Sequence, residues 1–202
     1  MEPVFKIIGF TSASRWFDAG REASIICEYL NSSAIDIFHL RKLDKDEEYV
    51  KSLMQYIPSN LHRRIILHSH FNLSDKYNFG GLHLKDESKE LTKKYKFVTR
   101  SCHSLAELQR KDVNVAYSFL SPIYNSISKR GYGSAFNIHD LDMLKIKAAS
   151  PVIALGGVTP EKFSEISHAK FAGAALLGYL WSPESTYKNK ISEILETRSS
   201  LQ

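Results

Sequence analysis

The chain has 202 residues, of which 43% are hydrophobic and 11% aromatic, so it can bury one well-packed domain and is not a disordered chain. Its 27 Lys and Arg and 22 Asp and Glu give a formal charge of +5, but the basic residues are scattered among acidic ones. This pattern argues against a nucleic-acid-binding surface and favours an anionic small molecule as the ligand.

Targeting and redox signals indicate a cytoplasmic protein. The longest apolar stretch, Phe171 to Trp181, is far too short to span a bilayer, and the first ten residues do not resemble a secretion signal. Cys27 and Cys102 lack the spacing of a metal or redox motif. We therefore expect plain thiols, a reducing compartment and no membrane partner.

Short β-rich runs alternate along the chain with segments in which apolar residues recur every three or four positions, as in βα units with a parallel sheet. The expected strands are Val4 to Phe10, Ala34 to Leu40, Arg64 to His68, Gly81 to Leu84, Phe97 to Thr99, Val115 to Phe119, Val152 to Leu155 and Ala174 to Leu177. The expected helices are Asp18 to Leu30, Lys45 to Ile57, Ser104 to Arg110, His139 to Lys147, Pro160 to Ser167 and Pro183 to Glu196.

Eight strands, each followed by a helix or turn, predict an α/β fold of the (β/α)8 TIM-barrel type, formed by residues 1–202 as a single domain. A doubly wound open sheet is the alternative that periodicity leaves open. In both folds ligands bind beyond the carboxyl ends of the strands. The residues that follow each strand are therefore the candidate site.

Glycines follow the last two predicted strands. Gly156 and Gly157 lie between a strand and a helix start, and Gly178 follows the eighth strand. Such glycines let backbone N–H groups approach a phosphate, and a TIM barrel often binds phosphate at these two loops. A tight connection between strand and helix is the structural alternative.

Cations and hydroxyls follow two other strands. Arg41 comes after the second strand, where a guanidinium can bind phosphate oxygens or form a salt bridge at the rim. The segment after the sixth strand carries Ser126, Ser128 and Lys129 close to two glycines. This segment is expected to bind an anion, although an exposed polar loop has a similar composition.

Four histidines, His39, His68, His83 and His103, fall at or near predicted strand ends. The His68-Ser69-His70 spacing occurs in metal-dependent hydrolases on barrels, but no Asp follows the last strand to act as a base. Hydrogen bonding within the core is the more ordinary role of such histidines.

Three segments in this order resemble the thiamine phosphate synthase/TenI family, and the resemblance covers nearly the whole chain. They are Arg100-Ser101-Cys102-His103-Ser104, Pro122 to Lys129, and Pro151 to Pro160. Synthases of that family join a pyrimidine diphosphate to a thiazole phosphate and release pyrophosphate with Mg²⁺. The resemblance thus implies a TIM barrel and phosphorylated small-molecule substrates.

Carried onto this chain, the resemblance implies that Arg41, Ser101 and Lys129 act on the diphosphate as the catalytic residues. It implies further binding residues for the substrates: His39 and His68 in place of the pyrimidine-contacting glutamine and asparagine, Ser126 and Ser128 in place of threonines, and Gly157 at the thiazole phosphate. Gly156 and Gly178 are phosphate-binding candidates from their place in the barrel.

The chain departs from both branches of the family. The two magnesium-binding aspartates of synthases align with Ser69 and Ser88, which leaves Asp86 and Glu87 as candidate Mg²⁺ ligands. The histidine on which TenI tautomerases rely aligns with Pro122. We expect a thiamine phosphate synthase-type transferase. The alternatives are a TenI-like thiazole tautomerase and a non-catalytic protein that binds a thiamine precursor; a homo-oligomer is left open.

Overall fold

Eight parallel strands close into a barrel in the computed structural model, which describes residues 4–12, 18–42, 47–85, 95–111, 115–125 and 135–201. The predicted TIM barrel is confirmed, and an open sheet is excluded. The strands are β1 (Lys6–Phe10), β2 (Ile37–Leu40), β3 (Ile65–Leu67), β4 (Gly81–Leu84), β5 (Val98–Cys102), β6 (Tyr117–Leu120), β7 (Val152–Ala154) and β8 (Gly173–Leu176).

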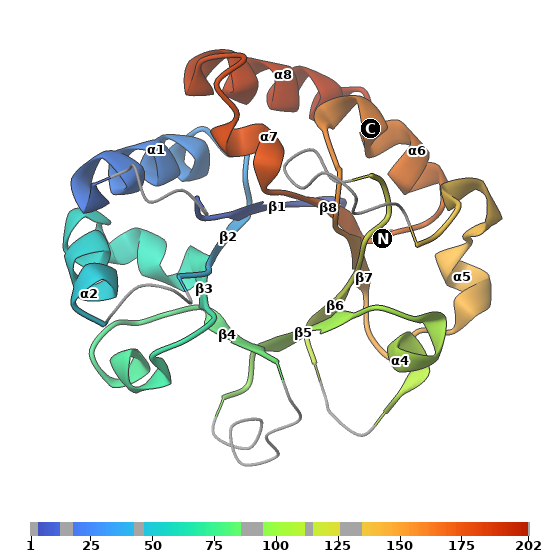
Figure 1. Cartoon of the computed structure of the whole chain (residues 1–202), viewed down its shortest axis with the longest axis horizontal. Helices are drawn as coiled ribbons and strands as arrows, with labels where there is room; N and C mark the ends of the chain where they lie inside the picture. The colour runs from blue at the N-terminus through green and yellow to red at the C-terminus, as the bar shows by residue number, and fades with distance from the viewer. Residues whose placement is uncertain are drawn as a thin grey trace.

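Each strand pairs with the next along the chain, and β1 pairs with β8 to close the barrel, with Lys6 opposite Gly173 and Ile8 opposite Ala175. The view along the barrel in Figure 1 shows the strands as an inner ring and the helices around it. Because all the strands are parallel, their carboxyl ends meet at one rim of the barrel, where residues far apart in sequence come together.

Helices cover the outside of the barrel. Those after the first two strands are α1 (Ala19–Asn31) and α2 (Glu47–Tyr56), and 3-10 helices η1 (Ser59–Arg64) and η2 (Phe71–Asp75) flank β3. The second half has α4 (Leu105–Gln109), η3 (Ile138–Asp140), α5 (Met143–Ile146), η4 (Pro160–Lys162), α6 (Phe163–His168), α7 (Gly178–Trp181) and α8 (Tyr187–Ser199). No helix among the described residues is long and apolar enough to cross a membrane.

A side chain caps the first turn of α1 and of α4, but not the turn that precedes α6. Asp18 caps α1 by accepting from the Arg21 amide, and Ser104 caps α4 by accepting from the Glu107 amide, as serine and aspartate do at this position. The Thr159 side chain makes no such bond, and Pro160 opens a 3-10 turn before α6.

Two boundaries close to the site differ from the prediction, the end of β5 and the start of the last helix. Strand β5 continues to Cys102 because Ser101 and Cys102 pair with Phe119 and Leu120 of β6. Ser101 is consequently a strand residue and does not belong to the following loop. After β8 the chain forms the short helix α7, so the last helix starts at Tyr187 and not at Pro183.

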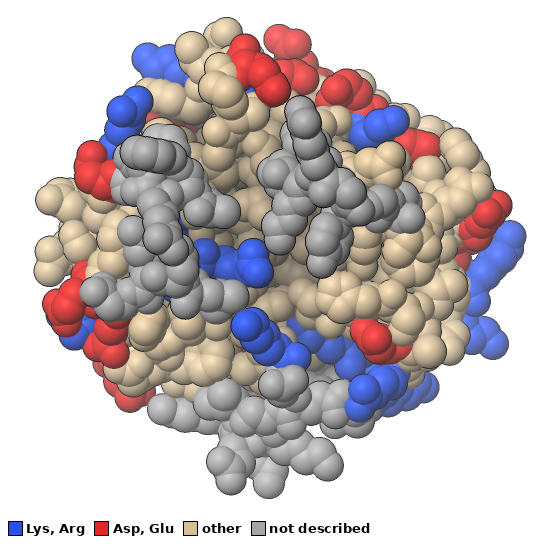
Figure 2. All heavy atoms as spheres, viewed as in Figure 1, with Lys and Arg blue, Asp and Glu red and all other residues tan. Residues whose placement is uncertain are grey.

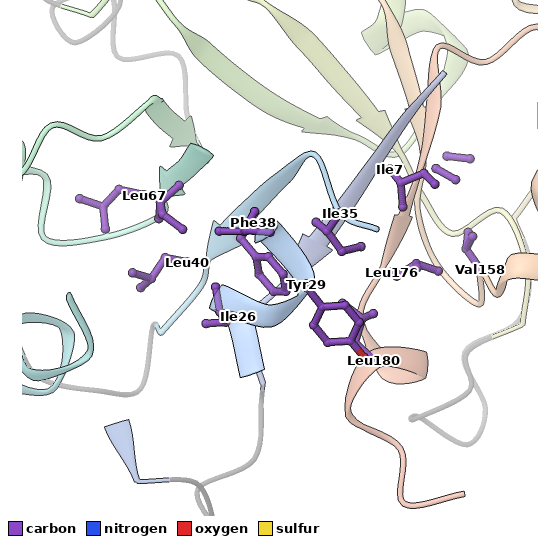
Figure 3. Close-up of a cluster of buried hydrophobic side chains, with 14 of the residues drawn as sticks. Ile7, Ile26, Tyr29, Ile35, Phe38, Leu40, Leu67, Val158, Leu176 and Leu180 are labelled. Atoms are coloured by element: carbon purple, nitrogen blue, oxygen red, sulfur yellow. The ribbon is translucent and has the colours of Figure 1, made fainter. Parts of the chain in front are cut away.

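Alternate strand positions separate two apolar layers. Outward residues such as Ile7, Phe38 and Leu67 pack against the helices, including Ile26 and Tyr29 of α1 (Figure 3). Inward residues fill the barrel with a second cluster that contains Ile8, Phe10, Tyr117, Phe119, Ile153 and Ala175. The barrel interior is thus a packed apolar core, and the polar side chains at its carboxyl end pack against this core.

Candidate active site at the carboxyl ends of the strands

Three histidines from neighbouring strands meet inside the barrel at its carboxyl end. His39 lies on β2, His68 directly follows β3, and His83 lies on β4; their exposed fractions are 0%, 9% and 4%. Nδ1 of His39 is 2.8 Å from Nε2 of His68, and the rings of His68 and His83 stack with centroids 4.2 Å apart. We call these three residues the histidine cluster.

Hydroxyl groups on β5 and β6 orient the cluster. The Thr99 hydroxyl donates to the Leu82 carbonyl, so its oxygen accepts from Nδ1–H of His83 at 2.9 Å. Nε2 of His83 then carries no proton and accepts from the Ser101 hydroxyl at 3.1 Å. On the other side, Nε2 of His39 makes a short hydrogen bond with Tyr117 Oη.

The surroundings keep these rings neutral. Burial, with a further contribution from the charge of Arg41, lowers the pKa of His83 to about 4. Burial is also the main cause that lowers the pKa of His39 and of His68 well below the usual value. The neighbouring histidines add to it, and at His68 the charges of Arg41 and Lys85 add further. At neutral pH the cluster therefore presents uncharged nitrogen atoms.

A buried ion pair joins α1 to the loop that follows β2. Lys42 Nζ lies 2.8 Å from Glu22 Oε2, and their side chains are 3% and 0% exposed. Glu22 also accepts from the Ser12 amide at 2.8 Å and from Tyr49 Oη at 2.9 Å, and Lys42 donates to the Ser12 carbonyl. This network fixes the chain at Arg41, whose amide donates to Thr11 Oγ1.

Arg41 itself is exposed, and its charge acts on both His68 and His83. In the view along the barrel, Lys and Arg side chains gather near the middle of the face and most Asp and Glu lie toward its edge (Figure 2). Among the described residues, positive charge thus predominates near the middle of this face, as expected for a site that binds an anion.

The paired glycines form a turn that no other residue fits. Gly156 and Gly157 have φ values of +96° and +64°, and a Cβ on Gly157 would lie 2.2 Å from the Asn125 carbonyl oxygen. The Tyr124 amide donates to the Gly156 carbonyl at 3.0 Å. The turn after β7 is therefore a tight connection that also holds the start of the segment after β6, and phosphate binding by these glycines stays a prediction.

The structure brings some of the sequence-predicted site residues together, and others lie outside the residues that it describes. Arg41, Ser101, His39 and His68 share the mouth, and Gly156, Gly157 and Gly178 lie at the same rim after β7 and β8. His70 is not in the cluster, because β3 ends at Leu67 and His70 has a left-handed backbone. The remaining candidates lie outside the described residues: Asp86, Glu87, Ser88, Ser126, Ser128 and Lys129.

The described residues do not fit Mg²⁺. This ion prefers oxygen ligands, above all carboxylates, whereas the cluster offers imidazole nitrogens. Ser69, which stands at the position of one magnesium aspartate, has a neutral hydroxyl that is buried without a hydrogen-bond partner. Asp86 and Glu87, which the sequence suggests as Mg²⁺ ligands, lie outside the described residues.

Sequence reasoning missed two parts of the site. Tyr117 and Thr99 contact the cluster from β6 and β5, and neither was a candidate. His83 was noted near a strand end but not counted among the binding residues. The two-residue period of the strands was the available signal, because it places Thr99 and Ser101, like Tyr117 and Phe119, on the inward face.

Fold and site together define a TIM-barrel protein whose polar side chains converge at the carboxyl ends of the strands. The model of the family described as thiamine monophosphate synthase (TMP-TENI) matches residues 12–180. A thiamine-phosphate synthase of Lactiplantibacillus plantarum is 34% identical over 86 residues, which are 42% of this chain and 40% of that protein. The match thus spans well under half the length of this curated relative.

Solved structures agree with this assignment. Thiamine phosphate pyrophosphorylase from Bacteroides thetaiotaomicron superposes with a TM-score of 0.74 at 29% identity, covering 98% of each chain. The enzyme of the same name from Pyrococcus furiosus reaches the same TM-score at 15% identity over 98% of each chain, which shows the fold alone. The chain belongs to the thiamine monophosphate synthase/TenI family.

Proposed function

We propose that the protein is a thiamine phosphate synthase-type transferase that joins hydroxymethylpyrimidine diphosphate to thiazole phosphate and releases pyrophosphate. The single observation that carries the proposal is the meeting of Arg41, Ser101 and the Gly156–Gly157 turn at one rim of a barrel of this family. The unpaired thiols of Cys27 and Cys102 suit a reducing compartment, and we place the reaction in the cytoplasm.

The proposed chemistry is the departure of a diphosphate, which gains negative charge as its bond to the pyrimidine carbon breaks. Fixed cations and hydroxyls stabilise such charge without reorganising. Arg41 is held by the loop network around Glu22, and Ser101 is held by His83. Lys129, Ser126 and Ser128 belong to the segment that starts beside the glycine turn, and we assign them to the same diphosphate.

The second phosphate is assigned to the loops after β7 and β8. A glycine turn after β7 and a short extra helix after β8 form a recurrent phosphate site in TIM barrels. Here the turn is Gly156–Gly157, and the short helix is α7, which begins at Gly178. The thiazole phosphate would therefore lie at the same mouth of the barrel as Arg41.

The test is to mix both substrates with Mg²⁺ and measure thiamine phosphate. We expect product from the wild-type protein, and kcat/KM lower by about 10²-fold in Arg41→Ala and in Lys129→Ala, the loss typical of removing one fixed charge-stabilising group. Arg63→Ala is the matched control, because Arg63 is exposed and precedes β3, at the opposite end of the barrel. Product no higher from the wild type than from Lys129→Ala would refute the proposal.

A further inference from the structure

The histidine cluster has a geometry that the transfer reaction does not require. One ring nitrogen from each of His39, His68 and His83 lies within 4.8 Å of one from each of the others. Within the part of the chain that the structure describes, no other set of three His, Cys, Asp or Glu side chains converges in this way. The three come from adjacent strands, whose backbone pairing fixes their separation.

In two of the three rings, one nitrogen forms a hydrogen bond with a hydroxyl group of the barrel, an arrangement that also occurs in metal sites. A metal-binding histidine normally donates its second ring N–H to a protein acceptor, which fixes the tautomer and the ring plane. Thr99 accepts from Nδ1–H of His83, which leaves Nε2 of that ring unprotonated, and an ion at Nε2 would replace the hydrogen bond from Ser101. Tyr117 Oη forms a hydrogen bond with Nε2 of His39, and Nδ1 of the same ring faces His68.

We propose that His39, His68 and His83 bind a divalent transition-metal ion of the zinc type. Imidazole is a preferred ligand of Zn²⁺, and sites with three protein ligands keep the fourth position for water or substrate. This inference does not rest on the proposed transfer reaction, since it concerns binding to the protein alone.

Ion binding requires a tautomer change at His39 or His68, whichever ring carries the shared proton, and a rotation of the stacked His68 and His83 rings toward the ion. In the unliganded cluster a proton lies between Nδ1 of His39 and Nε2 of His68. If His39 carries it, the proton moves to Nε2 when Nδ1 binds the ion, and Tyr117 Oη becomes the acceptor. The low pKa values of the three rings help, because nitrogen must be unprotonated to bind a metal.

Charge at the mouth restricts the fourth ligand. Arg41 and Lys85 act on His68 as positive charges and oppose a bare dication in the cluster. An anion in the fourth position, such as hydroxide or a phosphate oxygen, would offset this repulsion. The site therefore suits an ion that carries an anionic ligand.

The experiment is calorimetric titration of tag-free, chelator-treated protein with ZnCl₂, and separately with MgCl₂. Titration with CoCl₂ adds a visible absorption spectrum that reports tetrahedral nitrogen ligation. We expect one Zn²⁺ per chain, and no competition from excess Mg²⁺ for this site. His83→Gln should weaken Zn²⁺ binding by at least about tenfold, the lower end of the loss found when groups around a metal are removed.

The control variants are His103→Gln and His168→Gln, which change histidines outside the cluster and should bind Zn²⁺ like the wild type. Thr99→Val keeps all three rings but removes the acceptor at His83, so it should weaken binding even if His83→Gln folds poorly. Circular dichroism checks folding in each case. Absence of stoichiometric Zn²⁺ binding to the wild type, or equal weakening in His83→Gln and His103→Gln, would overturn the inference. Failure of the transfer assay alone would not affect it.

Discussion

Single residues stabilise the chain segments at the mouth of the barrel, and the buried ion pair of Lys42 with Glu22 is one example. Both side chains are buried, and Glu22 accepts from three groups on separate segments. We expect Glu22→Gln to lower the free energy of unfolding by about 3–5 kcal/mol, because it leaves the ammonium of Lys42 buried without its counter-charge. Urea unfolding measures this change.

The exposed pair of Lys51 with Glu48 on α2 provides the control, since Glu48 is 78% exposed. Glu48→Gln should change stability by no more than about 0.5 kcal/mol, because water already screens this pair. Similar losses in the two variants would show that burial does not set the strength of the Lys42–Glu22 pair.

The histidine cluster gives the protein a predictable response to acid. The pKa of His83 is about 4 in the folded state and about 6.5 in the unfolded chain, so only the unfolded chain takes up its proton between these values. Stability is complete above pH ~6.5 and falls as the pH approaches 4, by about 3 kcal/mol for this residue. His39 and His68 shift in the same direction and add to the slope.

Urea unfolding at several pH values between 7 and 4 tests this prediction. His83→Gln should flatten the dependence, whereas His168→Gln should leave it unchanged, because His168 is exposed on α6. An unchanged slope in His83→Gln would contradict the assignment of a low pKa to this ring.

At the scale of elements, the turn after β7 requires a glycine at position 157. Gly157 has a positive φ, and a Cβ there would collide with the Asn125 carbonyl. Gly157→Ala should therefore destabilise the protein by more than about 1 kcal/mol and displace the start of the segment after β6. The expected functional consequence is a higher KM for thiazole phosphate in the transfer assay.

The same substitution in α1 should act in the opposite direction. A Cβ on Gly20 would meet its nearest neighbours at 3.4 Å or more, and alanine is favoured over glycine in helices. Gly20→Ala should be neutral or stabilising by up to about 1 kcal/mol. Thermal unfolding of the two variants side by side distinguishes backbone strain from the general effect of adding a methyl group.

At the scale of the whole molecule, closure of the barrel depends on the seam between β1 and β8. Gly173 lies opposite Lys6, and a Cβ there would lie 2.1 Å from the Lys6 carbonyl oxygen. Gly173→Ala should cost about 1–3 kcal/mol, as overpacking does in a tight core, while the barrel still unfolds in one transition. Far- and near-ultraviolet circular dichroism should then give the same midpoint.

Gly20→Ala again serves as the matched change away from the seam. If Gly173→Ala instead separated the two transitions, the β1–β8 seam would open before the rest of the barrel. That outcome would contradict a single cooperative unit and show that strand pairing at the seam is weaker than elsewhere.

The sequence by itself determined the α/β class, the eight strands and the rim on which the candidate residues lie. These features depend on local periodicity and on the rule that parallel strands present their carboxyl ends together. Strands β4 and β5 show how far local signals predict strand boundaries. The predicted bounds of β4, Gly81 to Leu84, agree with the structure because local signals end this strand. The predicted end of β5 was too early, because Ser101 and Cys102 are strand residues only through their pairing with β6.

Only the tertiary structure decided which side chains meet. His39, His68 and His83 form one cluster because their strands are neighbours in a closed barrel, and Tyr117 reaches His39 from β6 across the interior. The Lys42–Glu22 pair likewise joins a loop and a helix. Contacts of this kind depend on closure and on the register between strands, which the local pattern of residues does not contain.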